Sequence, residues 1–248
     1  MNNVLKIKNL SKTYYTKLGS VEALNNVNLN VCDGEILGVI GNSGCGKSTL
    51  LSILSKLDDA TSGYIESIKG DYVVGYMLQN DALFPWLTIL DNATLGLKIK
   101  KIKTKENIEY TKKLLETYGL KDFMYKYPNS LSGGMKQRVA LIRTLAIKPD
   151  ILLLDEPFSR LDLINRLSIS DDVYNIIKQE KKTTIIISHD IAECISLCDR
   201  VAIMSKRPGT IKKIYNIELD NKSTPSCNRS DNKFYYYYDL LWKEIDKE

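Results

Sequence analysis

The apolar positions of the chain follow two strand patterns. Residues 27–31 alternate between apolar side chains and asparagine, which is the period of a half-exposed strand, and the dipeptide Asp-Gly at 33–34 follows as the signal of a tight hairpin turn. Residues 36–40, 151–154 and 185–187 are apolar without alternation, as is typical of parallel strands covered on both faces. The pattern therefore predicts an antiparallel N-terminal part and a layered α/β core.

Helical periodicity marks three further stretches. Within residues 163–177 it predicts a crossover helix between parallel strands. Residues 88–147 are rich in Lys and Glu and contain no convincing strand pattern, so we expect helices inserted between core strands. Residues 216–231 are polar and are expected to loop over the surface. Residues 234–245 are predicted to form a docked amphipathic helix, whose apolar face carries Phe234, Tyr238, Leu241, Trp242 and Ile245.

Composition excludes several classes of protein. Of 248 residues, 44% are hydrophobic and 26% are charged, which argues against disordered, collagen-like and coiled-coil chains. The net charge of +5 does not by itself mark a nucleic-acid binder.

No apolar stretch approaches the roughly 18 residues that span a bilayer, and the first residues lack the order of charged and apolar residues of a signal peptide, so a cytoplasmic protein is expected. Five cysteines without CxxC spacing argue against a disulfide framework or zinc site, and Cys194 and Cys198 are interpreted as buried apolar residues.

Residues 41–48, GNSGCGKS, match the phosphate-binding pattern G-x-x-x-x-G-K-[ST]. They stand between a buried strand and a predicted helix, where the mechanism needs them. The glycines let backbone N–H groups point at phosphate oxygens, and the helix start adds partial positive charge. Lys47 is expected to reach the β- and γ-phosphates, and the Ser48 hydroxyl suits Mg²⁺. Cys45 is interpreted as a small loop residue rather than a catalytic thiol.

Two carboxylates follow the apolar run 151–154, at the end of a buried strand where ligands bind in open α/β sheets. Asp155 is expected to hold Mg²⁺ as the acidic partner of Ser48. Glu156 is expected to polarise the water that attacks the γ-phosphate.

A second phosphate-facing helix start is predicted at residues 131–138, LSGGMKQR. With this segment the chain resembles the ATP-binding subunits of ABC transporters, whose LSGGQ signature it matches with Met135 in the fifth place. The resemblance implies a P-loop NTPase core with a mixed sheet and an inserted helical subdomain. It also implies that two copies sandwich each ATP between Lys47 of one chain and the signature of the other.

The same resemblance implies roles for further polar residues. Gln79 matches the Q-loop glutamine that reaches Mg²⁺ and the attacking water. His189, the single histidine of the chain, matches the switch histidine. Tyr14 matches the aromatic residue that stacks on adenine, with Tyr15 as the alternative.

The expected site residues fall into three groups. The catalytic group is Glu156, His189 and Gln79, and the Mg²⁺ ligands are Ser48, Gln79 and Asp155. The residues expected to bind ATP are Tyr14, Gly41, Asn42, Ser43, Gly44, Cys45, Gly46, Lys47, Ser48, Thr49, Ser132, Gly133 and Gly134. In the D-loop, Asp162 matches the family pattern, whereas Arg160 replaces the usual small residue.

The resemblance also implies the domain organisation. Residues 1–248 are expected to form one ABC ATPase domain. Within it, residues 1–82 and 148–215 form the nucleotide-binding core, residues 83–147 the helical subdomain, and residues 216–248 a tail with a docked helix.

Several segments indicate which subfamily the chain resembles. Residues 84–86, FPW, and 205–211, SKRPGTI, resemble importers of nitrate, sulfonates, taurine or pyrimidine precursors. The implied function is an ATPase that powers such an importer from the cytoplasmic face of the membrane, with permease subunits as direct partners and a solute-binding protein as an indirect one. The apolar residues near Gln79 are equally compatible with ordinary packing. The alternatives are a soluble ABC ATPase acting on nucleic acid or ribosomes, although no nucleic-acid partner is expected, and an assembly module without turnover.

Overall fold

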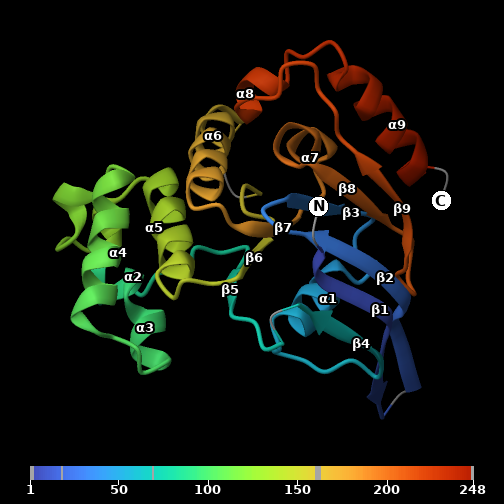
Figure 1. The fold of residues 1–248 in the computed structure, drawn as a ribbon, viewed down its shortest axis with the longest axis horizontal. Helices are drawn as coiled ribbons and strands as arrows, with labels where there is room; N and C mark the ends of the chain where they lie inside the picture. Colours follow the sequence, from blue (N-terminus) through green and yellow to red (C-terminus); the bar gives the residue numbers. More distant parts are fainter. Residues whose placement is uncertain (1–2, 18, 69, 160–162, 247–248) are drawn as a thin grey trace.

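A six-stranded sheet forms the centre of the computed structural model, which describes residues 3–17, 19–68, 70–159 and 163–246 (Figure 1). Its strands lie in the order β5-β6-β7-β3-β8-β9. Neighbouring strands are parallel except for β8 and β9, which are antiparallel. The strands are β3 Ile36–Ile40, β5 Val74–Met77, β6 Ile151–Asp155, β7 Thr183–Ile187, β8 Arg200–Met204 and β9 Ile211–Asn216.

The central strands β3, β6 and β7 are buried along their length, apart from half-buried Asp155. This burial on both faces is what their unbroken apolar runs predict. The helix α7, Ile191–Leu197, covers β3 so closely that a Cβ on Gly38 would lie 2.9 Å from Sγ of Cys198 and 3.2 Å from Sγ of Cys194. Both cysteines are buried, and the predicted α/β class with a mixed sheet is confirmed.

A three-stranded antiparallel sheet in the order β2-β1-β4 holds the N-terminal part of the chain. Its hairpin joins β1 to β2, with Thr16 opposite Gly19. The predicted hairpin at residues 33–34 is wrong, because β2 and β3 on either side of that turn belong to different sheets. The turn instead carries the chain from one sheet to the other. The strands are β1 Asn3–Thr16, β2 Gly19–Cys32 and β4 Ser62–Ser67.

The helix α1, Lys47–Leu54, packs between the two sheets. Its residues Leu50, Leu51 and Leu54 belong to a buried cluster that contains side chains of β1, β2, β3, β6 and β7. Burying apolar side chains from both sheets on one helix stabilises their relative placement, and that placement positions the residues around the N-terminus of α1.

Helices occupy the chain between β5 and β6, and no residue from 78 to 150, all of which the structure describes, lies in a strand. Figure 1 shows these helices gathered on one side of the molecule, beyond the β5 edge of the sheet. The prediction of helices inserted between core strands is therefore confirmed. The helices are α2 Ile89–Ala93, α3 Leu95–Ile99, α4 Lys105–Thr117, the 3₁₀ turns η1 Lys121–Phe123 and η2 Pro128–Ser130, and α5 Gly133–Leu145.

The crossover helix predicted between β6 and β7 is present as α6, Leu163–Gln179. The segment that follows β9 departs from the surface loop predicted for residues 216–231. Ile217 is only 3% exposed, and the buried Asn228 in the short helix α8, Pro225–Asn228, donates to the carbonyl oxygen of Ser196 over 2.7 Å. The prediction of a surface loop, which rested on polar composition alone, is therefore wrong for the buried part of this segment.

The C-terminal helix α9, Phe234–Asp246, docks as predicted. Phe234 and Leu241 are buried, and Tyr238 and Ile245 pack partly against the same core. Trp242 is 54% exposed and stacks on Tyr238, with 6.3 Å between ring centroids. No helix in the described ranges combines the length and the apolar character needed to cross a membrane.

Candidate nucleotide-binding site

The phosphate-binding loop, residues 41–48, connects the buried end of β3 to the first turn of α1. Gly44 has a φ of 76° and Gly46 a φ of 104°, a backbone region that favours glycine. A Cβ on Gly46 would also lie 2.7 Å from the carbonyl oxygen of Ala23. Because a side chain at either position would be strained, glycine keeps the loop curled so that its N–H groups can meet an anion.

Lys47 supplies the positive charge of this loop. The residue is 8% exposed, and its ammonium group donates to the carbonyl oxygens of Gly41 over 2.7 Å and Asn42 over 3.0 Å. These carbonyl oxygens are neutral, so they leave the positive charge available to a ligand, and the N-terminus of α1 adds to it. A buried cation on a glycine-rich helix start fits the phosphate chain of a nucleotide.

Tyr14 on β1 forms a second wall of the site. Its hydroxyl donates to Asp58 over 2.8 Å, and the ammonium group of Lys12 lies 4.9 Å from its ring centroid. Hydrogen bonds from Lys12 and then from Tyr14 lower the pKa of Asp58. These contacts hold Tyr14 in place, whereas its neighbour Tyr15 is 79% exposed and does not line the pocket.

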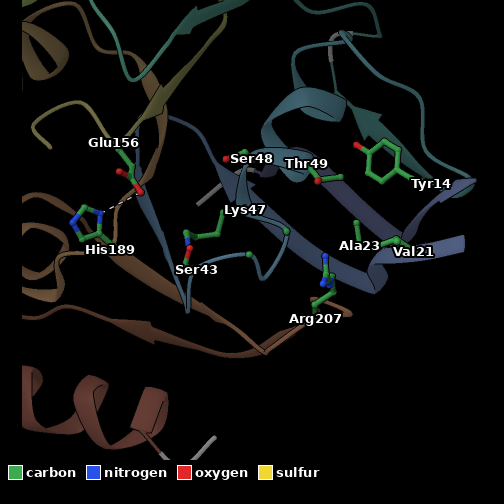
Figure 2. A pocket seen from close by; sticks show the side chains of 12 residues that line it. Tyr14, Val21, Ala23, Ser43, Lys47, Ser48, Thr49, Glu156, His189 and Arg207 are labelled. Atoms are coloured by element: carbon green, nitrogen blue, oxygen red, sulfur yellow. Dashed lines mark ion pairs between the residues drawn. The ribbon is translucent and has the colours of Figure 1, made fainter. Parts of the chain in front are cut away.

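A pocket of about 410 Å³ joins the loop to this wall (Figure 2). Figure 2 shows Tyr14 at one end and Glu156 and His189 at the other, with Lys47 and Ser48 between them. An elongated site with an aromatic ring at one end and a carboxylate at the other suits an extended nucleotide. The lining residues are Tyr14, Val21, Ala23, Ser43, Gly44, Gly46, Lys47, Ser48, Thr49, Glu156, His189 and Arg207.

Asp155 lies at the C-terminal end of β6, half-buried beside the pocket. Its Oδ2 accepts a hydrogen bond from the hydroxyl of Tyr76 over 3.1 Å. Burial raises the pKa of Asp155, and the neighbouring charge of Glu156 raises it further, while Tyr76 and Lys47 oppose the shift. A partly desolvated carboxylate of this kind gains from binding a cation.

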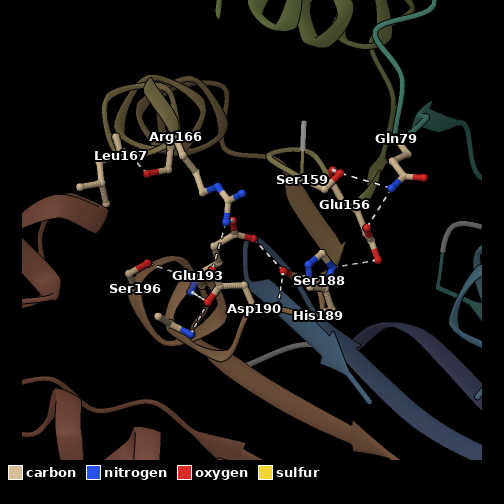
Figure 3. A network of polar contacts seen from close by, with 12 residues as sticks. Gln79, Glu156, Ser159, Arg166, Leu167, Ser188, His189, Asp190, Glu193 and Ser196 are labelled. Atoms are coloured by element: carbon tan, nitrogen blue, oxygen red, sulfur yellow. Dashed lines mark hydrogen bonds and ion pairs between the residues drawn. The ribbon is translucent and has the colours of Figure 1, made fainter. Parts of the chain in front are cut away.

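Glu156 connects three segments of the site (Figure 3). Its Oε2 accepts from Nε2 of Gln79 over 2.9 Å, and its Oε1 lies 3.2 Å from Nδ1 of His189. The residue has a φ of 45°, and its backbone N–H donates to the carbonyl oxygen of Ile187 on β7 over 2.9 Å. The fold thus brings together the three residues predicted as the catalytic group, and both carboxylate oxygens of Glu156 have a partner.

A polar network supports the segment that carries His189 (Figure 3). Ser188 donates through its hydroxyl to Glu193 over 2.7 Å and accepts from the backbone N–H of Asp190 over 3.0 Å. Arg166 of α6 lies 3.4 Å from Asp190 and 3.6 Å from Glu193. Burial raises the pKa of Glu193, and the hydrogen bond from Ser188 opposes the shift. These contacts fix the backbone on both sides of His189.

The signature residues stand apart from this pocket. Ser132 caps α5, because its hydroxyl accepts from the N–H of Met135 over 3.4 Å, and it is exposed together with Gly133. A Cβ on Gly134 would lie 2.6 Å from Cδ1 of Ile169, so this glycine permits close packing on α6. None of the three residues lines the pocket of their own chain.

Other predicted residues lie beside the pocket without lining it. Gly41 and Asn42 line a neighbouring cavity together with Trp242 of α9, while Cys45 is buried in the loop. Gln79 and Asp155 do not line the pocket, although Gln79 donates to Glu156, which does. The predicted D-loop residues Arg160 and Asp162 lie outside the described part of the chain.

Val21, Ala23 and Arg207 line the pocket but are absent from the residues predicted from sequence. Val21 pairs with Tyr14 across the β1–β2 hairpin, so the long register of that hairpin brings it to the pocket. Arg207 lies in the loop between β8 and β9, within the segment 205–211, whose sequence indicates the subfamily but not a place at the pocket.

Comparison with known proteins identifies the family of the chain. The ABC transporter family model matches residues 24–159. The nitrate import ATP-binding protein NrtD of Synechocystis is 37% identical over 96% of this chain and 93% of its own length. The aliphatic sulfonates import ATP-binding protein SsuB of Bacillus anthracis is 41% identical over 90% of each protein.

The fold also matches a solved cassette. The dimeric ATP-binding cassette MJ0796, in a post-hydrolysis state with ADP and Pi, superposes with a TM-score of 0.72 and is 31% identical over 86% of this chain and 99% of that chain. Sequence and fold therefore agree, and the chain belongs to the ABC transporter family as an ATP-binding cassette ATPase.

Proposed function

We propose that the chain powers a membrane importer for a small anion or organic solute of the nitrate, sulfonate or taurine type. The observation that carries the proposal is the convergence of the phosphate loop, Glu156 and His189 on one pocket that the signature of the same chain does not reach. Two relatives named for nitrate and sulfonate import support the solute class. These names support import rather than action on nucleic acid or ribosomes.

In this proposal ATP lies along the pocket with adenine against Tyr14 and its phosphates on the loop. Lys47 binds the phosphates through its charge, and the loop N–H groups hold their oxygens. Ser48, Asp155 and Gln79 are the residues that would hold Mg²⁺, since hydroxyl, carboxylate and amide oxygens are its preferred ligands. When bound, Mg²⁺ would neutralise charge on the β- and γ-phosphates.

Hydrolysis requires a water placed against the γ-phosphate. Glu156 lines the end of the pocket opposite Tyr14 and is the carboxylate that can orient this water and accept its proton. Gln79 and His189 each hold one oxygen of Glu156, so they set the direction from which it meets the water. His189 also lines the pocket and can contact the γ-phosphate.

A second copy of the chain completes the site in this proposal. The start of α5 exposes Ser132 and Gly133 with free backbone N–H groups at a helix N-terminus, which suits the phosphates of a nucleotide bound to a facing chain. The dimeric cassette MJ0796 supports this arrangement.

An apolar groove beside the sheet edge is the proposed contact with the permease. It is lined by Leu78 and Phe84 from the segment between β5 and α2 and by Ile99 of α3, which are 45%, 38% and 71% exposed. Trp86, which is 70% exposed, lies with its ring 5.2 Å from that of Phe84. A helix of a membrane subunit that fills this groove would hold the chain peripherally at the cytoplasmic face, with a solute-binding protein as the indirect partner.

Solute uptake by cells tests the importer proposal. Deleting the gene should abolish uptake of one labelled solute among nitrate, alkyl sulfonates and taurine, and the wild-type gene should restore it. A gene with Glu156→Gln should not restore uptake although its product accumulates normally. Unchanged uptake of all these solutes after deletion would contradict the proposed solute class.

A further inference from the structure

The loop between β8 and β9, residues 205–210, is attached to two walls of the nucleotide pocket. The N–H of Gly209 donates to the carbonyl oxygen of Ala23 over 3.0 Å, and its carbonyl oxygen accepts from the N–H of Asn25 over 2.9 Å. A Cβ on Gly209 would lie 2.0 Å from the carbonyl oxygen of Cys45. The loop therefore packs directly on both β2 and the phosphate-binding loop.

Ser205 fixes the shape of this loop from within. Its hydroxyl donates to the carbonyl oxygen of Pro208 over 3.2 Å and accepts from the N–H of Thr210 over 3.0 Å. Its backbone N–H donates to the carbonyl oxygen of Thr210 over 2.9 Å. The residues between Ser205 and Thr210 are thus held in one conformation relative to the pocket.

Arg207 lies at the exposed tip of this loop and lines the nucleotide pocket. Within the part of the chain that the structure describes, no hydrogen bond or ion pair engages its guanidinium group. Figure 2 shows this group on the same side of the pocket as Val21 and Ala23, directed toward the phosphate-binding loop. A cation that is held at a ligand pocket without a protein partner is available to an anionic ligand.

We propose that Arg207 is a nucleotide-binding residue that pairs with the phosphate groups nearest the ribose. The planar guanidinium group carries a fork of N–H donors that matches phosphate oxygens. Its place on the Ala23 side of the pocket, between the Tyr14 end and Lys47, corresponds to the ribose-proximal phosphates in the orientation proposed above. The inference rests on that proposed orientation, and it adds a second cation to the one that Lys47 provides.

Direct binding measurements test this assignment. Affinities for MgATP and MgADP are measured by isothermal titration calorimetry at low and high salt for the wild type, Arg207→Gln and Arg207→Lys. Lys213→Gln is the matched control, because it removes one positive charge from β9, adjacent to the same loop, at a residue that does not line the pocket. Thermal unfolding without nucleotide checks that each variant is folded.

We expect Arg207→Gln to weaken ATP and ADP binding by roughly 5- to 20-fold at low salt, as for a partly exposed charge-assisted hydrogen bond. The loss should shrink at high salt, Arg207→Lys should retain part of the affinity, and Lys213→Gln should bind as the wild type does. Wild-type affinity in Arg207→Gln at low salt overturns the proposal. A loss that is independent of salt and equal in Arg207→Lys also overturns it. Wild-type affinity in Lys47→Ala would instead overturn the nucleotide site itself, so the two failures are distinguishable.

Discussion

We expect the substitution Glu156→Gln to slow ATP hydrolysis by roughly 100- to 10,000-fold, the range that a positioned general base contributes. In the wild type both oxygens of the carboxylate are engaged, one by Gln79 at 2.9 Å and the other by His189 at 3.2 Å. Glutamine keeps the size of the side chain but offers one oxygen and one NH₂ group, so one of these donors loses its acceptor. The substitution also removes the charge that can take a proton from water. The expected loss corresponds to about 3 to 5 kcal/mol of transition-state stabilisation.

Binding of ATP should change far less than turnover. In the proposed binding mode the charge of Lys47 attracts the phosphates, and adenine lies against Tyr14, at the opposite end of the pocket from Glu156. We therefore expect the affinity of Glu156→Gln for MgATP to stay within a few-fold of the wild-type value, as for a residue that acts mainly in the transition state. Phosphate release under saturating ATP and nucleotide titration separate these two quantities.

Slow hydrolysis should also make the ATP-bound dimer visible. Light scattering of Glu156→Gln with ATP should report a dimer, and adding Ser132→Arg should abolish it by placing a bulky cation at the exposed cap of α5. Glu109→Gln is the matched control, because Glu109 pairs with Lys112 on the exposed face of α4 and lies outside the pocket. Hydrolysis by Glu156→Gln at the wild-type rate would refute the role of Glu156 and leave water activation to Gln79, His189 or the γ-phosphate.

The remaining predictions concern binding and stability. Lys47→Ala should impair both ATP binding and turnover, because Lys47 supplies charge to the phosphates. Tyr14→Ala should chiefly weaken binding, because Tyr14 supplies a stacking face. If the two variants lost binding and turnover equally in titrations and steady-state kinetics, this division of roles would be contradicted. Burial raises the pKa of Glu193 above its ordinary value of 4.5, so folding favours the protonated form of this side chain. The wild type should therefore lose stability relative to Glu193→Gln as the pH rises from 4.5 through the raised pKa. Thermal unfolding across that range measures the difference, and a difference independent of pH would show that Glu193 does not titrate as expected.

Local chemistry explains which parts of the site the sequence could predict. The phosphate loop needs glycines at positive φ, a lysine and a following helix, and all of these are contiguous in residues 41–48. The capping serine of α5 and the two carboxylates at the C-terminal end of β6 are equally local signals. Each of these features depends on the backbone of one short segment, so its sequence is sufficient.

The features of the fold and the site that sequence patterns could not predict depend on which distant segments contact each other. The dipeptide at residues 33–34 correctly marks a change of direction, but a turn signal does not specify the partner of the next strand, and β3 pairs with β7 and β8 instead of β2. Arg207 was missed for the same reason. Its relation to the pocket depends on the contact between Gly209 and the phosphate loop, which lie far apart in the sequence.

The helix α5 connects two regions that the proposed mechanism must coordinate. Its N-terminal cap is the signature residue Ser132, and near its other end the guanidinium group of Arg143 donates to the carbonyl oxygens of Asp81 over 2.6 Å and Ala82 over 2.8 Å. Those carbonyls follow Gln79 in a segment that leads into the apolar groove. Because Ser132 and Arg143 belong to the same 13-residue helix, docking of the signature on a second copy and filling of the groove by a permease would both displace the segment of residues 81–82. Through Gln79 that displacement acts on Glu156, so we expect turnover to depend on both partners.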